Sequence, residues 1–275
     1  MLSSRKKNTR KAWQQVLTSR DSSRARGMEY IRQLFSEYVL HRGDRAIGED
    51  SSLLCGIGNL NGMIVSFIIS NKGEDLNEQI ANNFGMCSPE GFHKAIRTMQ
   101  QAEKFGRPLI TIVDTPGAYP GIHAEEQGQS IAIARSLMTM MNLRIPVVTA
   151  IVGEGGSGGA LGIACGNRVL MFENAIYSVI SPEGFASILW KNSKRADEAS
   201  EILKLTSDHL LDYGIVDEVV AEVPYQNKEE FRQNIVTLKE RIYHHLQELI
   251  AYSGEELSKQ RAKRFQKFGE ESWES

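Results

Sequence analysis

The stretch that decides the fold runs Ile145-Pro-Val-Val-Thr-Ala-Ile-Val152 and continues Gly153-Glu-Gly-Gly-Ser-Gly-Gly-Ala160. Its first half is mostly apolar and predicts a buried strand, and its second half predicts a tight turn into a helix that begins near Ala160. Backbone amides at a helix start, without side chains to cover them, form a site for negative charge. Close packing needs one or two glycines, and this turn has five in seven residues. We therefore expect the turn to bind an anion or an oxyanion.

The preceding strand along the chain ends in a second unusual loop. Leu109 to Asp114 is apolar and rich in β-branched residues, and Thr115-Pro-Gly-Ala-Tyr-Pro-Gly121 comes next, before a helix expected over 125–141. The two prolines restrict φ, and the two glycines permit positive φ. This loop is therefore predicted to be rigid and to expose backbone amides. Two such loops on neighbouring strands can hold a thioester or ureido carbonyl between their amides.

The remaining patterns extend the alternation of strands and helices in both directions. Asn61-Gly62 tolerates positive φ at both central positions of a hairpin turn. Apolar strands separated by helices favour an α/β core that is covered on both faces, with function at the strand-to-helix turns. The expected strands cover 53–59, 63–70, 169–172 and 176–179, and the expected helices cover 28–40, 88–105, 182–190, a stretch from 231 and another after 254.

Two shorter motifs overlap the glycine turn. Gly153, Gly155 and Gly158 have the spacing of the dinucleotide fingerprint, although Glu173 lies closer than the acid that usually binds the ribose. Ser157 lies between two glycines as in the nucleophile elbow of α/β-hydrolases, which needs a histidine downstream. Neither motif explains the second loop. The downstream histidines are His209, His244 and His245.

The composition is that of a globular enzyme without a strong charge bias. The chain has 275 residues, a formal net charge of -2 and a pI near 6.3, which give no global attraction to nucleic acid or to anionic membranes. It has no secretory signal and no long apolar run, so a soluble cytoplasmic protein is expected. Cys55, Cys87 and Cys165 form no paired motif, so no metal is expected in this chain.

The chain opens with a basic arm, residues 1–27. Between Met1 and Arg26 it has eight Lys/Arg residues and one acid, Asp21. A solvated amphipathic arm that docks on a partner is the main expectation, with nucleic-acid contact as the alternative.

Longer strings of sequence match a known family. The segments 114–121, 124–130, 153–161 and 177–184 read DTPGAYPG, AEEQGQS, GEGGSGGAL and YSVISPEG. In this order they resemble the carboxyltransferase α subunit family of multi-subunit, bacterial-type acetyl-CoA carboxylase, and the likeness runs roughly from residue 28 to residue 223.

The resemblance implies an α/β fold of the crotonase/ClpP-like kind, a spiral of ββα units with helical extensions at both ends. It divides the chain into the basic arm (1–27), a crotonase-like carboxyltransferase domain (28–223) and a C-terminal helical extension (224–275). It also implies that a carboxyl group passes from carboxybiotin, carried on biotin carboxyl carrier protein, to acetyl-CoA. The product is malonyl-CoA for fatty acid biosynthesis. The implied partners are a zinc-containing β subunit in an α2β2 heterotetramer, biotin carboxylase and the carrier protein.

The family's site residues carry over by position. Gly158 and Gly159 would donate the amides of an oxyanion hole to the biotin carbonyl. A biotin nitrogen can serve as the base, so preorganised amides are sufficient and no side-chain base is needed. The carboxybiotin pocket would be formed by Gly117, Ala118, Gly155, Gly156 and Lys72.

Two segments depart from the family pattern. Residues 74–83 are acidic and neutral where the family is basic, and residues 22–27 lack the usual proline. Both departures concern partner contacts more than the chemistry. Two other functions stay open: a non-catalytic or differently specific paralogue, and a stand-alone crotonase-type acyl-CoA hydratase or hydrolase, which needs an acid or base near the turn.

Overall fold

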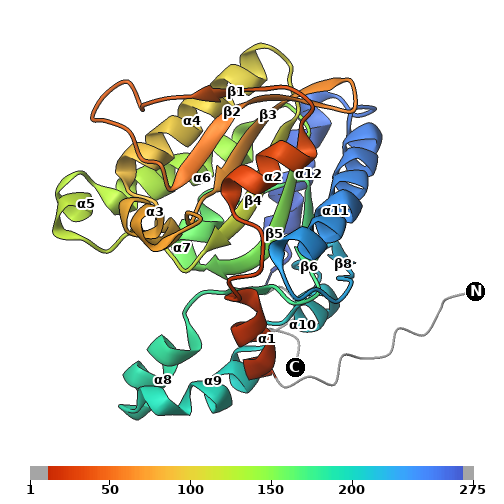
Figure 1. Cartoon of the computed structure of the whole chain (residues 1–275). Coiled ribbons are helices and arrows are strands. Elements are labelled where there is room, and N and C mark those ends of the chain that lie inside the picture. The colour runs from red at the N-terminus through yellow and green to blue at the C-terminus, as the bar shows by residue number, and fades with distance from the viewer. Residues whose placement is uncertain (1–11, 269–275) are drawn as a thin grey trace, which may run out of the picture.

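A computed structural model of the protein describes residues 12–268 (Figure 1). Within these residues eight strands form one mixed sheet in the order β1-β2-β3-β4-β5-β6-β8, and β7 pairs with the end of β5. The strands are β1 (Tyr38–His41), β2 (Leu53–Leu60), β3 (Met63–Ser70), β4 (Leu109–Thr115), β5 (Val147–Gly156), β6 (Arg168–Phe172), β7 (Ile176–Ser178) and β8 (Glu218–Val220).

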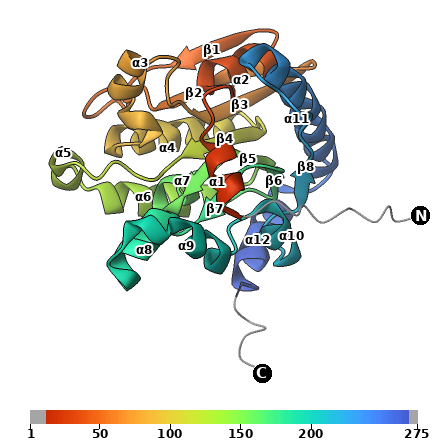
Figure 2. The same ribbon diagram turned by 60° about the horizontal axis from the view of Figure 1, so that its bottom comes forward.

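Helices cover both faces of this sheet. Figures 1 and 2 show α4 (Pro89–Lys104) and α6 (Gln129–Asn142) on one face, and α2 (Gly27–Leu34) and α11 (Lys228–Leu249) on the other. All seven residues of β4 are buried, which explains why its sequence is continuously apolar rather than alternating. The other helices are α1 (Ala12–Ser19), α3 (Leu76–Ala81), α5 (Ile122–Glu126), α7 (Ser157–Leu161), α8 (Pro182–Trp190), α9 (Ala196–Leu203), α10 (Ser207–Asp212) and α12 (Gly254–Gln266), with short 3-10 turns at Asn83–Gly85 and Ser193–Arg195.

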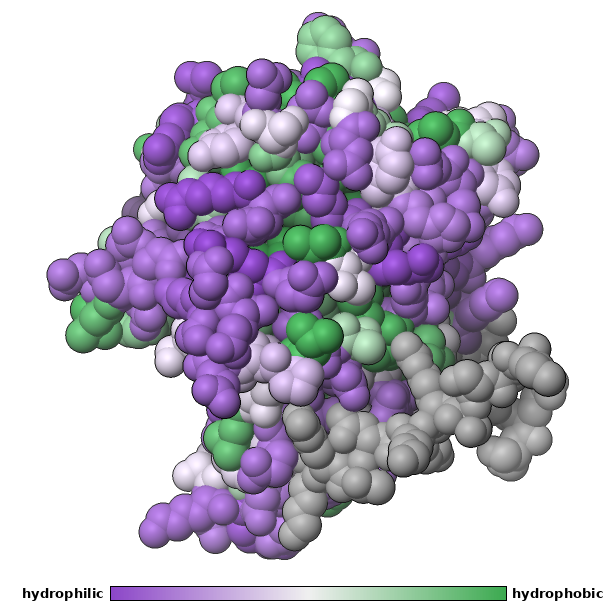
Figure 3. All heavy atoms as spheres, turned by 45° about the vertical axis from the view of Figure 1, so that its right-hand side comes forward, coloured by the Kyte–Doolittle hydropathy of each residue, from purple (hydrophilic) through white to green (hydrophobic). Residues whose placement is uncertain are grey.

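The hairpin and the C-terminal helices confirm the sequence prediction. Asn61 and Gly62 have φ values of 51° and 89°, as the two-residue turn between β2 and β3 requires. The predicted apolar stripe of α11 is fully buried against the sheet, while the α11 side of the molecule is mostly hydrophilic (Figure 3). None of the described helices is both long enough and apolar enough to cross a membrane.

The helix predicted over 28–40 is wrong in its second half. α2 ends at Leu34, and the chain continues as the edge strand β1. Phe35 is buried under Gly58 and stacks on Phe67 at a centroid distance of 4.8 Å, so its spacing from α2 reflects core packing rather than a longer helix. The helix predicted over 125–141 is likewise interrupted, because Gly128 adopts a φ of 79° between α5 and α6.

The described part of the basic arm, residues 12–27, packs against the rest of the chain. Figure 2 shows α1 beside β7 and β5. Arg24 is 1% exposed, pairs with Glu222 at 2.8 Å and donates to the carbonyl of Val152 at 2.6 Å. The expectation of a solvated arm is therefore wrong for this part. Residues 1–11 lie outside the described residues.

Candidate active site

The two loops singled out in the sequence are in direct backbone contact. A Cβ atom added to Gly156 would lie 2.0 Å from the carbonyl oxygen of Pro116. One added to Gly159 would lie 2.3 Å from the carbonyl carbon of Gly117. Real Cβ atoms do not approach backbone this closely, so both positions accept only glycine without a shift of the loops. These glycines allow the end of β5 to press against the loop after β4.

The glycine turn begins later than the sequence predicts. β5 continues to Gly156 because its end pairs with two strands: Gly155 lies opposite Thr115 of β4 and opposite Tyr177 of β7. The helix α7 starts directly afterwards at Ser157, whose φ of 46° turns the chain sharply. Strand pairing on both sides therefore holds the start of α7 in place.

Several amides at this contact have no acceptor among the described residues. In α7 they belong to Gly158 and Gly159, and in the facing loop to Ala118. The amide of Gly117 differs, because it donates to Thr115 Oγ1 at 3.2 Å and is not free for a ligand. Free, preorganised amides from two facing loops are the arrangement that stabilises a developing oxyanion.

An apolar cavity of about 550 Å³ opens beside Gly158, whereas Gly159 and Ala118 are not among its lining residues. Its volume is in the usual range for small-molecule sites. Gly158 lies at its wall, whereas Gly155 and Gly156 border a smaller cleft with Pro116. The cavity has no carboxylate and no histidine among its described lining residues. Its apolar lining includes Leu161, Val169, Tyr177, Leu210, Ile215 and Phe265.

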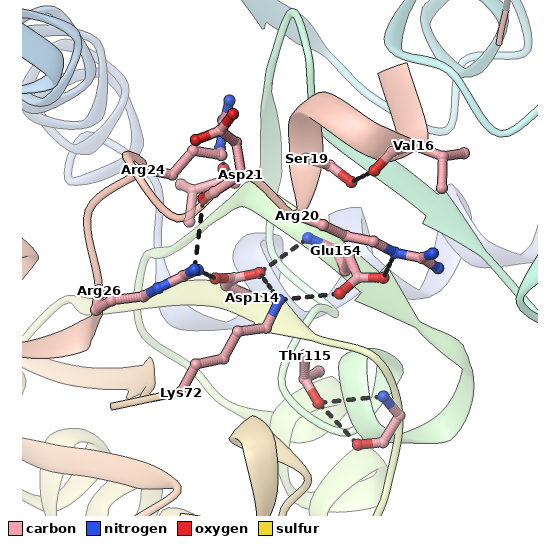
Figure 4. A network of polar contacts seen from close by, with 12 residues as sticks. Val16, Ser19, Arg20, Asp21, Arg24, Arg26, Lys72, Asp114, Thr115 and Glu154 are labelled. Atoms are coloured by element: carbon pink, nitrogen blue, oxygen red, sulfur yellow. Dashed lines mark hydrogen bonds and ion pairs between the residues drawn. The ribbon is translucent and has the colours of Figure 1, made fainter. Parts of the chain in front are cut away.

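A buried network of charges lies beneath the two loops (Figure 4). Lys72, two residues after the end of β3, is 9% exposed and contacts Asp114 Oδ1 at 2.7 Å and Glu154 Oε2 at 3.0 Å. Arg26 contacts Asp114 Oδ2 at 3.3 Å, and Arg20 Nε contacts Glu154 Oε1 at 2.7 Å. Burial alone would raise the pKa of Asp114, but Lys72 and Arg26 hold this pKa below its ordinary value.

The network changes the account of Lys72. The family resemblance implied that Lys72 lines the carboxybiotin pocket, and the structure places its amine between two carboxylates under the loops. Its contact with a substrate stays a prediction. Sequence reasoning missed Asp114 and Glu154, although each is an acid at the end of an apolar strand. An acid at the end of a buried strand indicates a partner elsewhere in the chain, because a buried carboxylate must be paired or hydrogen-bonded.

The sequence of the chain matches a known family over nearly its whole length. The profile described as "Acetyl co-enzyme A carboxylase carboxyltransferase-like" matches residues 3–269. The chain belongs to this family. Among its relatives, the acetyl-coenzyme A carboxylase carboxyl transferase subunit alpha of Streptococcus gordonii is 46% identical over 253 residues, covering 92% of this chain and 97% of that protein. The same subunit of Carboxydothermus hydrogenoformans is 46% identical over 257 residues, covering 94% and 80%.

Solved structures confirm the crotonase-like carboxyltransferase fold. Transcarboxylase 12S superposes with a TM-score of 0.69 at 18% identity, covering 84% of this chain and 43% of that one. The chain thus spans less than half of the transcarboxylase chain. A Pseudomonas malonate decarboxylase hetero-tetramer in complex with coenzyme A gives a TM-score of 0.68 at 17% identity, covering 90% and 100%.

The hydrolase and dinucleotide interpretations find no support in this member of the carboxyltransferase family. Ser157 has no histidine partner within residues 12–268, and the Nδ1 atom of His209 lies 2.7 Å from Thr206 Oγ1 instead. Glu173 accepts the amide of Glu222 at 3.3 Å, away from the glycine turn. Residues 12–268 contain no group of three or more His, Cys, Asp or Glu side chains that can hold a metal ion.

Proposed function

We propose that the chain is the α half of an acetyl-CoA carboxylase carboxyltransferase, which transfers the carboxyl group of carboxybiotin to acetyl-CoA and forms malonyl-CoA for fatty acid biosynthesis. Relatives that carry this subunit's name are 46% identical over more than nine-tenths of the chain. The structural observation that carries the proposal is the pairing of free amides from two facing loops. The reaction takes place in the cytoplasm, as expected from the sequence.

In this reaction the protein's task is electrostatic. The amides of Gly158 and Ala118, with Gly159 as a further donor, stabilise negative charge on the ureido oxygen of the biotin ring. Breaking of the N–C bond of carboxybiotin releases CO2 and leaves negative charge on the ureido group. The freed ring nitrogen can then take up a proton from the acetyl methyl group, and the resulting thioester enolate attacks the CO2 to form malonyl-CoA. Gly117 shapes the pocket through its carbonyl, which accepts from the Thr115 hydroxyl at 2.7 Å. The apolar cavity beside Gly158 holds the uncharged parts of the reactants and excludes water.

The second half of the site comes from a β chain. Two helices further along the chain from the loops expose apolar side chains, each more than half accessible: Ile131 and Met138 on α6, and Ile188 and Leu189 on α8. Val179, which lies beside the cavity, is 80% exposed. Apolar groups gathered around a site mark an interaction surface. We place the zinc-containing β subunit here, in an α2β2 heterotetramer, with biotin carboxyl carrier protein and biotin carboxylase as further partners.

A stand-alone hydratase or hydrolase is disfavoured by the cavity itself. Such an enzyme needs a general acid or base within hydrogen-bond reach of the substrate. The described cavity wall has no carboxylate and no histidine, the commonest of these groups, and its ionisable side chains are Lys204, Tyr177 and Tyr213.

Co-purification with the β subunit of the same organism, followed by an assay of malonyl-CoA formation, tests the proposal. Carboxybiotin on the carrier protein and acetyl-CoA are the substrates. The expected result is a stable complex that forms malonyl-CoA. A folded complex without this activity would point to the non-catalytic paralogue.

A further inference from the structure

β4 and β5 lose their register at the point where the two loops begin. They pair residue by residue from Leu109 opposite Val147 to Val113 opposite Ile151, and then Thr115 lies opposite Gly155. One residue of β4, Asp114, therefore faces three residues of β5. A bulge of this kind bends a strand and re-aims the next segment of the chain. Here it sets the direction in which β5 enters α7.

The Asp114 carboxylate fills the bulge. Its Oδ1 atom accepts the amide of Glu154 at 3.0 Å, in place of the missing ladder partner. A Cβ atom on Gly153 would lie 2.3 Å from the same oxygen, so the glycine leaves the space that the carboxylate occupies. One side chain thus bridges the ends of the two strands.

Cations from other parts of the chain hold this carboxylate in place. Lys72 lies two residues after the end of β3, and Arg26 is the residue before α2. Both side chains point at Asp114 in Figure 4, and each is at most 10% exposed. Charged groups buried this deeply interact strongly and are costly to leave without a partner. Asp114 is therefore fixed by contacts on both of its oxygens.

The two residues joined by this bridge lie at the same separation along the chain from the two amides. Ala118 lies four residues after Asp114, and Gly158 lies four residues after Glu154. We propose that Asp114 is a positioning residue for carboxyl transfer, whose carboxylate sets the spacing between the Ala118 and Gly158 amides by joining the ends of β4 and β5. This inference rests on the proposed function. A misplacement of about 1 Å at a catalytic site can cost on the order of 10² in rate, so the bridge matters even though it touches no reactant.

The test compares Asp114→Asn with the double variant Asp114→Asn/Lys72→Met in the α/β complex. The single variant leaves the Lys72 and Arg26 cations facing a neutral amide and should melt earlier. The double variant removes one cation together with the anion, so the net charge of the network is restored. Part of the lost melting temperature should return, although Arg26 still faces a neutral amide and Glu154 keeps only Arg20. Lys94→Met is the control, because Lys94 is also buried but pairs elsewhere, with Glu49 and the carbonyl of Asp50.

The expected result is a fall in kcat on the order of 10² for both Asp114 variants, with little change in KM for acetyl-CoA. Lys94→Met should lower the melting temperature and leave kcat near native. If the double variant recovers its melting temperature and turns over within about threefold of native, Asp114 has a structural role only and the inference is wrong.

Amide hydrogen exchange of the chain without its partner separates this inference from the proposed function. In the double variant, peptides that cover residues 115–121 and 153–161 should exchange at least about tenfold faster than in Lys94→Met. Unchanged exchange in both loops would overturn the inference, whatever reaction the native complex catalyses. If the native complex transfers no carboxyl group, but both loops of the double variant lose protection from exchange, the proposed function is wrong and the positioning role of Asp114 is supported.

Discussion

Replacement of Gly159 by alanine probes the contact between the two loops. The new Cβ atom would lie 2.3 Å from the carbonyl carbon of Gly117 and 2.5 Å from the amide nitrogen of Ala118. Relaxed contacts between carbon atoms are about 3.5–4.0 Å long, so the loops must separate by about 1 Å or more. Overpacking of this kind costs about 1–3 kcal/mol in the free energy of unfolding. The separation should also lower turnover on the order of 10².

Gly158→Ala is the control, because it is the same substitution one residue earlier. Its Cβ atom would lie 3.5 Å from Ile133 Cδ1, an ordinary contact. The variant should melt at or slightly above the native temperature, since alanine loses less entropy than glycine in a helix, and should lose less than about tenfold in turnover. Both variants are assayed for malonyl-CoA formation in the α/β complex, with thermal melts alongside. Native turnover and stability in Gly159→Ala would refute the reasoning, as would a larger loss in Gly158→Ala.

Three further results are expected. Ser157→Ala and Glu173→Gln should each keep activity within about threefold of native in the same assay, because neither side chain serves as nucleophile or ribose ligand; loss of activity in either would revive the corresponding motif. The folded-state pKa of Asp114 is depressed below its ordinary value of 3.8, so its stabilisation is present above that value and is lost as the pH falls through the folded pKa. The difference in melting temperature between the native protein and Asp114→Asn should therefore stay constant from pH 8 to about 5. It should become smaller as the pH falls below about 4. All three thiols are buried, and burial raises the pKa of Cys55 to about 11. No cysteine should react with an aromatic disulfide reagent at pH 8 until the chain unfolds, whereas rapid reaction of the native protein would contradict this burial.

The sequence was sufficient for the features that depend on local chemistry. Asn61-Gly62 predicted the hairpin, the helix expected over 88–105 is α4, and the apolar run ending at Asp114 is a buried parallel strand. The glycine turn predicted an anion or oxyanion site, which stays a prediction; the close approach of the two loops at Gly156 and Gly159 is a finding of the structure. In these cases backbone geometry restricts the residue type directly, so a single sequence carries the information.

Features that depend on contacts between distant segments were not predictable. Lys72 has the sequence environment of a surface lysine, and only the fold brings it between Asp114 and Glu154. The same holds for Arg24 and Arg26, which look like part of a solvated basic arm and are buried in ion pairs. Helical spacing also misled where Phe35 faces the core after the helix has ended. Periodicity records which side of the chain is buried, and not which segment buries it.

In the proposed function, this chain supplies one half of a carboxyltransferase site. The most direct measurement is malonyl-CoA-dependent carboxylation of free biotin, the reaction in reverse, by the pure chain, by the pure β subunit and by their mixture. Turnover is expected from the mixture alone, with a loss on the order of 10² when the mixture contains Gly159→Ala. Turnover by the pure chain, or an assembled and folded mixture that carboxylates no biotin, would contradict this expectation.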